Sequence, residues 1–187
     1  MPADNLESCM IAHCAPTLAG LKSAGLFRYF FLSREVARQE LQQVNEMLND
    51  KGVYVEVMEW RAEWVLLYAY RKRHLERELA EPSAQKLLRE YGYRTQTVEQ
   101  AVEYLKQRVQ NSICFPHEIG LFLGYPVEDV RGFIENKGQN CKCCGLWKVY
   151  CNEEETLELF CKLKKCSSIY QKVFASGRSL ERMTIVA

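Results

Sequence analysis

Helical spacing of apolar residues recurs along much of the chain. Between residues 33 and 49, apolar side chains return every three or four positions, at Ala37, Leu41, Val44 and Leu48. This period places them on one face, as in an amphipathic helix, and Ser33 is suited to cap the first turn. The same period predicts helices over residues 97–109 and 153–175.

Strand patterns fall in a short segment over residues 146–150 and in three longer segments. Residues 26–32 are rich in aromatic side chains, residues 53–58 alternate valine with larger or polar residues, and residues 64–70 are continuously apolar. Alternation predicts a strand with one buried face, whereas a continuous apolar run predicts a central strand. A short connection joins the last two segments, so we expect a β-hairpin near residues 53–70. Because helices outnumber strands, we predict a helix-rich α+β fold with a small, mainly antiparallel sheet, in a single domain over residues 1–187.

The densest group of turn and capping signals lies in the sequence FPHEIGLFLGYPVEDVRGF, residues 115–133. Proline is favoured at the first position of a helix, so Pro116 and Pro126 each predict a helix start. Gly124 is placed to end the first helix in a left-handed conformation. The pattern predicts two short helices joined by a tight turn.

His117 and Glu118 fall in the first turn of the first of these helices. A histidine beside the positive end of a helix dipole tends to lose its proton, and a neutral imidazole is what a general base or a metal ligand needs. The plainer alternatives are that Glu118 only caps the helix and that His117 only bonds to backbone.

The overall charge balance argues against polyanionic partners. The 187 residues carry a formal net charge of +1, and 26% of them are charged, as in ordinary globular proteins. The basic run over residues 71–74 is followed directly by glutamates, and we interpret it as a solvated helix face. No apolar run approaches the roughly 18 residues of a membrane span, and the first residues lack the basic and apolar regions of a signal peptide. We therefore expect a cytoplasmic protein with no nucleic-acid or membrane partner.

Nine cysteines are many for a cytoplasmic chain, and their odd number argues against a disulfide framework. Cys14 stands shortly before Pro16, which predicts a helix start, so we expect Cys14 just before the first turn. The N–H groups of that turn would lower the pKa of the thiol and favour a reactive thiolate, with Lys22 about two turns further along. The alternative is that Cys14 is a small, buried apolar residue.

A second group of thiols lies in a later, loop-like segment: Cys141, Cys143, Cys144 and Cys151. Soft thiolates select zinc, iron–sulfur clusters or copper(I), so these four residues are the candidate ligands of a thiolate-bound metal. Their spacing lacks the paired C-x₂-C of a zinc ribbon, and reduced thiols without a metal are the alternative. Whether the protein uses any other cofactor is left open by the sequence.

Three sequence blocks are typical of one protein family. They are CAPTLAGLK at residues 14–22, FPHEIGLFLGYP at residues 115–126 and GLWKVY at residues 145–150. Together they resemble the signature of a bacterial family of unknown function, found mostly in Clostridia and related anaerobes, and the resemblance covers nearly the whole chain. It implies a single-domain, cytoplasmic, stand-alone protein and carries over no activity or substrate. The blocks contain six residues that we take as candidates for a site: Cys14, Lys22, His117, Glu118, Tyr125 and Trp147.

The hypothesis that joins these signals is a pocket shared by Cys14 and His117. Two helix starts that meet there would form a positive, N–H-lined concavity for an anionic or carbonyl-bearing small molecule. A thiol activated beside a neutral imidazole could act as a catalytic nucleophile, with Glu118 contacting the substrate or Lys22. The other walls would come from three side chains: Lys22, Tyr125 and Trp147.

The alternative is a binding module without catalysis. Residues 118–134 align with a helix-turn-helix, whose second helix would enter the DNA major groove. Its exposed positions would be Glu128, Asp129, Arg131 and Gly132, which are mostly acidic or small and would repel phosphates. Plain packing of two helices is the simpler interpretation. The sequence leaves open whether the protein is an enzyme, and it does not indicate an oligomeric state.

Overall fold

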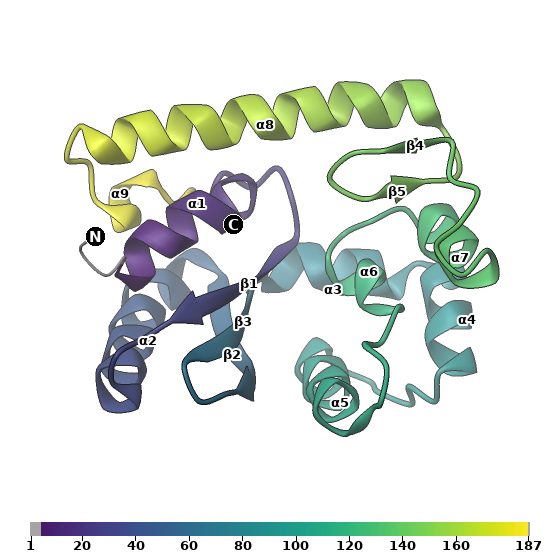
Figure 1. The fold of residues 1–187 in the computed structure, drawn as a ribbon, viewed down its shortest axis with the longest axis horizontal. Coiled ribbons are helices and arrows are strands. Elements are labelled where there is room, and N and C mark those ends of the chain that lie inside the picture. Colours follow the sequence, from purple (N-terminus) through teal and green to yellow (C-terminus); the bar gives the residue numbers. More distant parts are fainter. Residues whose placement is uncertain (1–4, 187) are drawn as a thin grey trace. The chain divides into compact units, whose positions relative to one another are not determined.

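A computed structural model describes residues 5–186, and its internal contacts divide the chain into two compact units. Unit 1 comprises Met1–His74 and Lys165–Ala187, and unit 2 comprises Leu75–Lys164. Figure 1 shows the helices and strands of the chain, coloured along the sequence. The expectation of a single domain stays a prediction.

Unit 1 is built on a three-stranded antiparallel sheet with the strand order β1-β3-β2. Its strands are β1 (Ala24–Phe30), β2 (Val53–Trp60) and β3 (Trp64–Arg71), and β2 and β3 form the predicted hairpin. The continuously apolar segment is the central strand, as predicted. The helices of unit 1 are α1 (Leu6–Leu18), α2 (Arg34–Leu48), the 3₁₀ helix η1 (Asn49–Lys51) and α9 (Leu180–Met183). The α+β class is confirmed.

The core of unit 1 forms where the helices cover the sheet. Phe27, Val55 and Leu67, one from each strand, cluster with Met10 of α1, and all four are buried. Phe27 and Leu67 are direct neighbours in the strand register. α2 begins after Ser33, whose hydroxyl accepts a first-turn N–H as the sequence predicts. Burial of the apolar faces that the sequence periodicity predicts therefore stabilises this unit.

Helix α1 corrects the expectation that Pro16 starts a helix. The helix begins after Asn5, whose side chain accepts the N–H of Ser8, and Pro16 lies inside the last turn. Apolar residues recur at helical spacing from Leu6 onwards, so burial of that face carries the helix through the proline, which loses one N–H near the helix end. Cys14 therefore lies near the C-terminal end of α1, where the negative pole of the dipole does not favour a thiolate.

Arg71 is buried at the end of β3, contrary to the solvated helix face expected for residues 71–74. Its guanidinium donates to the main-chain oxygens of Thr17 at 2.5 Å, Leu18 at 2.7 Å and Ile185 at 2.7 Å. Two of these oxygens end α1, where the helix dipole favours a positive charge. Burial lowers the pKa of Arg71 from its ordinary value. The residue thus ties α1, β3 and the C-terminal segment of unit 1 together.

Unit 2 is mainly helical. The elements that lie in it wholly or in part are α3 (Lys72–Ala80), α4 (Pro82–Glu90), α5 (Val98–Asn111), α6 (Ile119–Phe122), α7 (Val127–Glu135), β4 (Cys143–Cys144), β5 (Lys148–Val149) and α8 (Glu153–Ala175). The strands β4 and β5 form a short hairpin, of which the sequence predicted only one strand. No helix in residues 5–186 is both long and apolar enough to span a membrane.

Candidate functional site

A cavity of about 310 Å³ lies within unit 2, in the segment singled out by its turn signals and the hairpin that follows. It is lined by the turn before α6, by α6 and α7 and by the β4–β5 hairpin. Three residues predicted for the site line it: His117, Tyr125 and Trp147. Phe133 and Lys148 also line it, and sequence reasoning missed both. The structure therefore brings together His117, Tyr125 and Trp147 of the predicted site.

A glycine-ended turn shapes one wall of this cavity. Gly124 has a φ of 71°, as predicted for the end of the first short helix. The N–H of Tyr125 donates to the oxygen of Gly120 at 3.0 Å, and the N–H of Gly124 donates to Leu121 at 3.1 Å, which is the Schellman arrangement. A Cβ atom on Gly120 would lie 2.7 Å from Val130, so only glycine allows α6 to approach α7 this closely. The sequence signals here define the local geometry correctly.

Asp129 fixes the opposite wall. The residue is 2% exposed, and its carboxylate accepts three hydrogen bonds, from Trp147 Nε1 at 2.8 Å, Tyr150 N at 2.7 Å and Cys151 N at 3.0 Å. The expectation that Asp129 is an exposed position of a recognition helix is therefore wrong. Its place in the first turn of α7 also lets the helix dipole favour its charge. Asp129 joins α7 to the end of the β4–β5 hairpin and orients the indole of Trp147.

Aromatic rings make up much of the pocket wall. Tyr125 and Trp147 stack with their ring centroids 4.6 Å apart, and Trp147 meets Phe160 of α8 edge-on at 4.5 Å. His117 meets Phe133 edge-on at 5.1 Å. Such offset and edge-on pairs are favourable geometries that hold rings in place. The pocket is therefore a preformed aromatic cavity.

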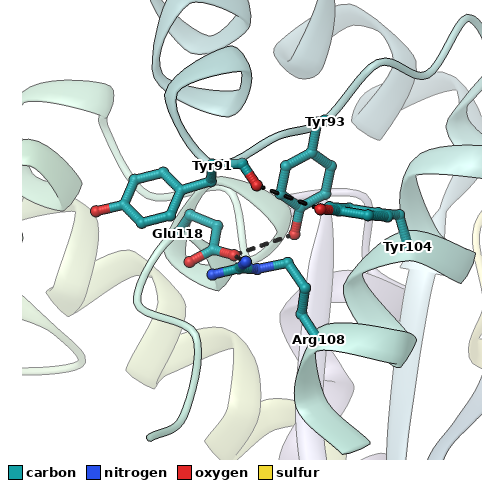
Figure 2. A network of polar contacts seen from close by, with 5 residues as sticks. All are labelled: Tyr91, Tyr93, Tyr104, Arg108 and Glu118. Atoms are coloured by element: carbon teal, nitrogen blue, oxygen red, sulfur yellow. Dashed lines mark hydrogen bonds and ion pairs between the residues drawn. The ribbon is translucent and has the colours of Figure 1, made fainter. Parts of the chain in front are cut away.

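Glu118 lies in a separate, buried polar network. Figure 2 shows its carboxylate beside Arg108, with which it forms an ion pair, and below Tyr93, whose hydroxyl donates to it at 3.3 Å. Burial, and next the charge of Glu118, raise the pKa of Tyr93 well above its ordinary value, which keeps that hydroxyl a donor. Tyr104 donates to the main-chain oxygen of Tyr91 in the same network. Glu118 thus pairs with Arg108 inside unit 2, and its expected contact with a substrate or Lys22 stays a prediction.

Cys14 and Lys22 belong to unit 1, whereas His117 belongs to unit 2. Cys14 is 1% exposed, and burial raises the pKa of its thiol to about 12, with Lys22 as a smaller, opposing influence. The expectation of a lowered pKa is therefore wrong, because the thiol is in the core. Lys22 Nζ donates to the oxygen of Ala24 at 2.9 Å. The approach of Cys14 to His117 stays a prediction.

Burial of Cys14 predicts low reactivity. At pH 8, we expect iodoacetamide to modify the exposed Cys144 and Cys161 at least roughly a hundredfold faster than Cys14, because a pKa near 12 leaves almost no thiolate. Mass spectrometry of timed digests measures the rates, and urea-unfolded protein is the control in which all sites react. Labelling of folded Cys14 at the rate of Cys161 would contradict this account.

The four later cysteines are all free thiols in the structure: Cys141, Cys143, Cys144 and Cys151. Cys144 is exposed and the other three are partly buried. Within residues 5–186, no group of three or more His, Cys, Asp or Glu side chains is arranged to hold a metal ion. A thiolate-bound metal at these positions stays a prediction, and the geometry adds no support to it.

Comparison with known proteins gives a family match. A family model described as a protein of unknown function (DUF3793) matches residues 10–184, which is most of the chain. No curated protein and no solved structure matches. The family match agrees with the resemblance that the three sequence blocks suggested.

Proposed function

The chain belongs to this DUF3793 family of proteins of unknown function, and we propose that its unit 2 binds a small molecule with a flat, apolar body in the aromatic cavity. The observation that carries the proposal is the cavity itself. Its volume, about 310 Å³, lies at the lower end of the range for small-molecule sites. A cavity of this size suits a ligand with a single ring or with two fused rings.

The rim of the cavity supports a binding role. Phe115 and Leu146 both line the cavity, yet they are 47% and 44% exposed. Apolar side chains of this size are stabilised when a ligand removes their surface from water. A planar ring that enters beside Trp147 and Phe133 would cover the two rim residues, Phe115 and Leu146.

Rigidity of the wall also supports binding. Asp129 and the stacked Tyr125 hold the Trp147 indole in one orientation before any ligand arrives. A preformed site avoids the entropy that ordering side chains on binding would cost. The same polar contacts make this wall unsuited to catalysis, because the Asp129 carboxylate already accepts three hydrogen bonds.

Binding is therefore favoured over thiol catalysis by Cys14 and His117. Catalysis requires an accessible thiol of lowered pKa. Cys14 is buried, and its pKa is raised. We further propose a cytoplasmic location, because the nine thiols, all free, suit a reducing compartment.

A panel of fused-ring compounds tests the proposed function. Indole, quinoline and 2-naphthol are titrated into the full chain by isothermal calorimetry, and we expect at least one to bind with one-to-one stoichiometry. Phe115→Ala should weaken that binding by about tenfold, because it removes an apolar side chain of the rim that is about half exposed without ligand and contributes little to folding.

The matched control is Phe30→Ala, which removes an exposed phenylalanine from β1 in unit 1. It should leave the affinity unchanged. The proposal fails if no compound binds, or if the two variants lower the affinity equally.

A further inference from the structure

We propose that the ligand of this cavity is an anion, a planar ring carboxylate, whose acid group is bound by Lys148 together with His117. The inference rests on the proposed small-molecule function of unit 2 and adds the chemical class of the ligand. It is carried by the placement of two nitrogen-bearing side chains beside one aromatic ring and by the hydrogen-bonding capacity that Lys148 keeps for a ligand.

Lys148 brings a positive charge to the wall of the cavity. It lies on β5, and its Nζ is 5.9 Å from the centroid of the Phe133 ring. Nζ donates to the main-chain oxygen of Gly138 at 2.6 Å. An ammonium group has three N–H donors, so this bond positions the group and leaves donor capacity for a ligand.

The carboxylates in and around the cavity are held by other partners. Among the described residues that line the cavity, Asp129 is the one carboxylate, and its two oxygens accept from an indole N–H and two backbone N–H groups. Glu118 is paired with Arg108 and does not line the cavity. Glu128 is exposed on α7 and also lies outside the lining. Lys148 is therefore the charged side chain of the lining that keeps hydrogen-bonding capacity for a ligand, and a ligand carboxylate can accept from it in a charge-assisted bond.

His117 lies against the same ring as Lys148. The imidazole meets Phe133 edge-on at 5.1 Å and is exposed, so its ring nitrogens are accessible. A carboxylate has two oxygens and can accept one hydrogen bond from each of the two side chains. A ligand placed in this way would have its ring against Trp147 and the apolar rim and its acid group beside Phe133. Two donating side chains match the two oxygens of a carboxylate, which favours that group over a phosphate with more oxygens to satisfy.

Matched ligands separate this inference from the proposed function. The full chain is titrated by calorimetry with 2-naphthoate, with its neutral counterpart 2-naphthamide and with 2-naphthyl phosphate. We expect 2-naphthoate to bind at least about tenfold more tightly than 2-naphthamide, because the charged hydrogen bonds need the acid. Lys148→Met should lower the affinity for 2-naphthoate at least about tenfold and the affinity for 2-naphthamide by much less, and the binding of 2-naphthamide that remains reports that the cavity is intact.

Lys142→Met is the control, because Lys142 precedes β4, is exposed and does not line the cavity. It should change neither affinity. Equal binding of the acid and the amide overturns the inference and leaves the proposed function standing. Tighter binding of the phosphate overturns the choice of a carboxylate. If none of the three compounds binds, both proposals fall.

Discussion

Replacing Asp129 with alanine is expected to lower the free energy of unfolding by about 3 kcal/mol, since the change leaves three donors without their acceptor. These donors are the indole N–H of Trp147 and the backbone N–H groups of Tyr150 and Cys151. The Trp147 side chain is buried, so water cannot replace the lost bond there without opening the wall. Urea unfolding followed by circular dichroism measures the loss.

Two companion variants make this result specific. Asp129→Asn keeps one acceptor oxygen but places an amide donor toward one of the three N–H groups. It should therefore lower the free energy of unfolding by less than Asp129→Ala does, by roughly 1–2 kcal/mol. Glu128→Gln removes the neighbouring, exposed carboxylate in the same helical turn and should change stability by less than about 0.5 kcal/mol. Equal effects of Asp129→Ala and Glu128→Gln would show that Asp129 does not hold the hairpin.

Replacing Arg108 with methionine is the second change with a large expected effect. Glu118 is fully buried, and Arg108 is its charged partner, so the variant leaves a buried carboxylate without a cation (Figure 2). Breaking such a pair from one side typically costs about 3–5 kcal/mol. Because Arg108 is itself partly exposed, we expect about 3 kcal/mol, measured by urea unfolding.

The double variant Arg108→Met with Glu118→Gln decides whether charge is the cause. It removes the buried charge as well as its partner, so it should recover more than half of the loss. Arg131→Met is the matched control, because Arg131 forms a surface ion pair with Glu90 at 3.4 Å, and such pairs contribute less than about 1 kcal/mol. If the double variant is no more stable than Arg108→Met, the loss of stability does not come from leaving the buried Glu118 carboxylate without a cation.

Local sequence patterns predicted the fold well where neighbouring residues determine the geometry of an element. The Ser33 cap, the hairpin of β2 and β3 and the left-handed Gly124 all follow from nearby residues. Pro16 was misjudged because a buried apolar face, which extends along the whole of α1, outweighed the loss of one N–H bond. Arg71 was misjudged because its three acceptors come from segments far away in the chain.

The candidate site was predicted in part for the same reason. His117, Tyr125 and Trp147 stand in blocks with strong turn and aromatic signals, and they do line one cavity. Asp129 has the sequence signature of an ordinary helix-start acid, and its three hydrogen bonds depend on a hairpin that only the folded chain brings near. Lys148 likewise becomes a candidate site residue only through its position near the Phe133 ring, which lies on another element. Contacts between elements are what a local pattern cannot supply.

The central claim is that a planar ligand binds beside Trp147, and the indole N–H resonances of the full chain test it most directly. The chain has three tryptophans, of which Trp60 and Trp64 lie in unit 1 and Trp147 lines the cavity. Trp147→Phe assigns the third resonance by removing it. On titration with 2-naphthoate, the Trp147 resonance should shift in a saturable way, and those of Trp60 and Trp64 should stay in place. A saturable shift of Trp60 or Trp64 with Trp147 unmoved, or no shift at any of the three, would contradict the account.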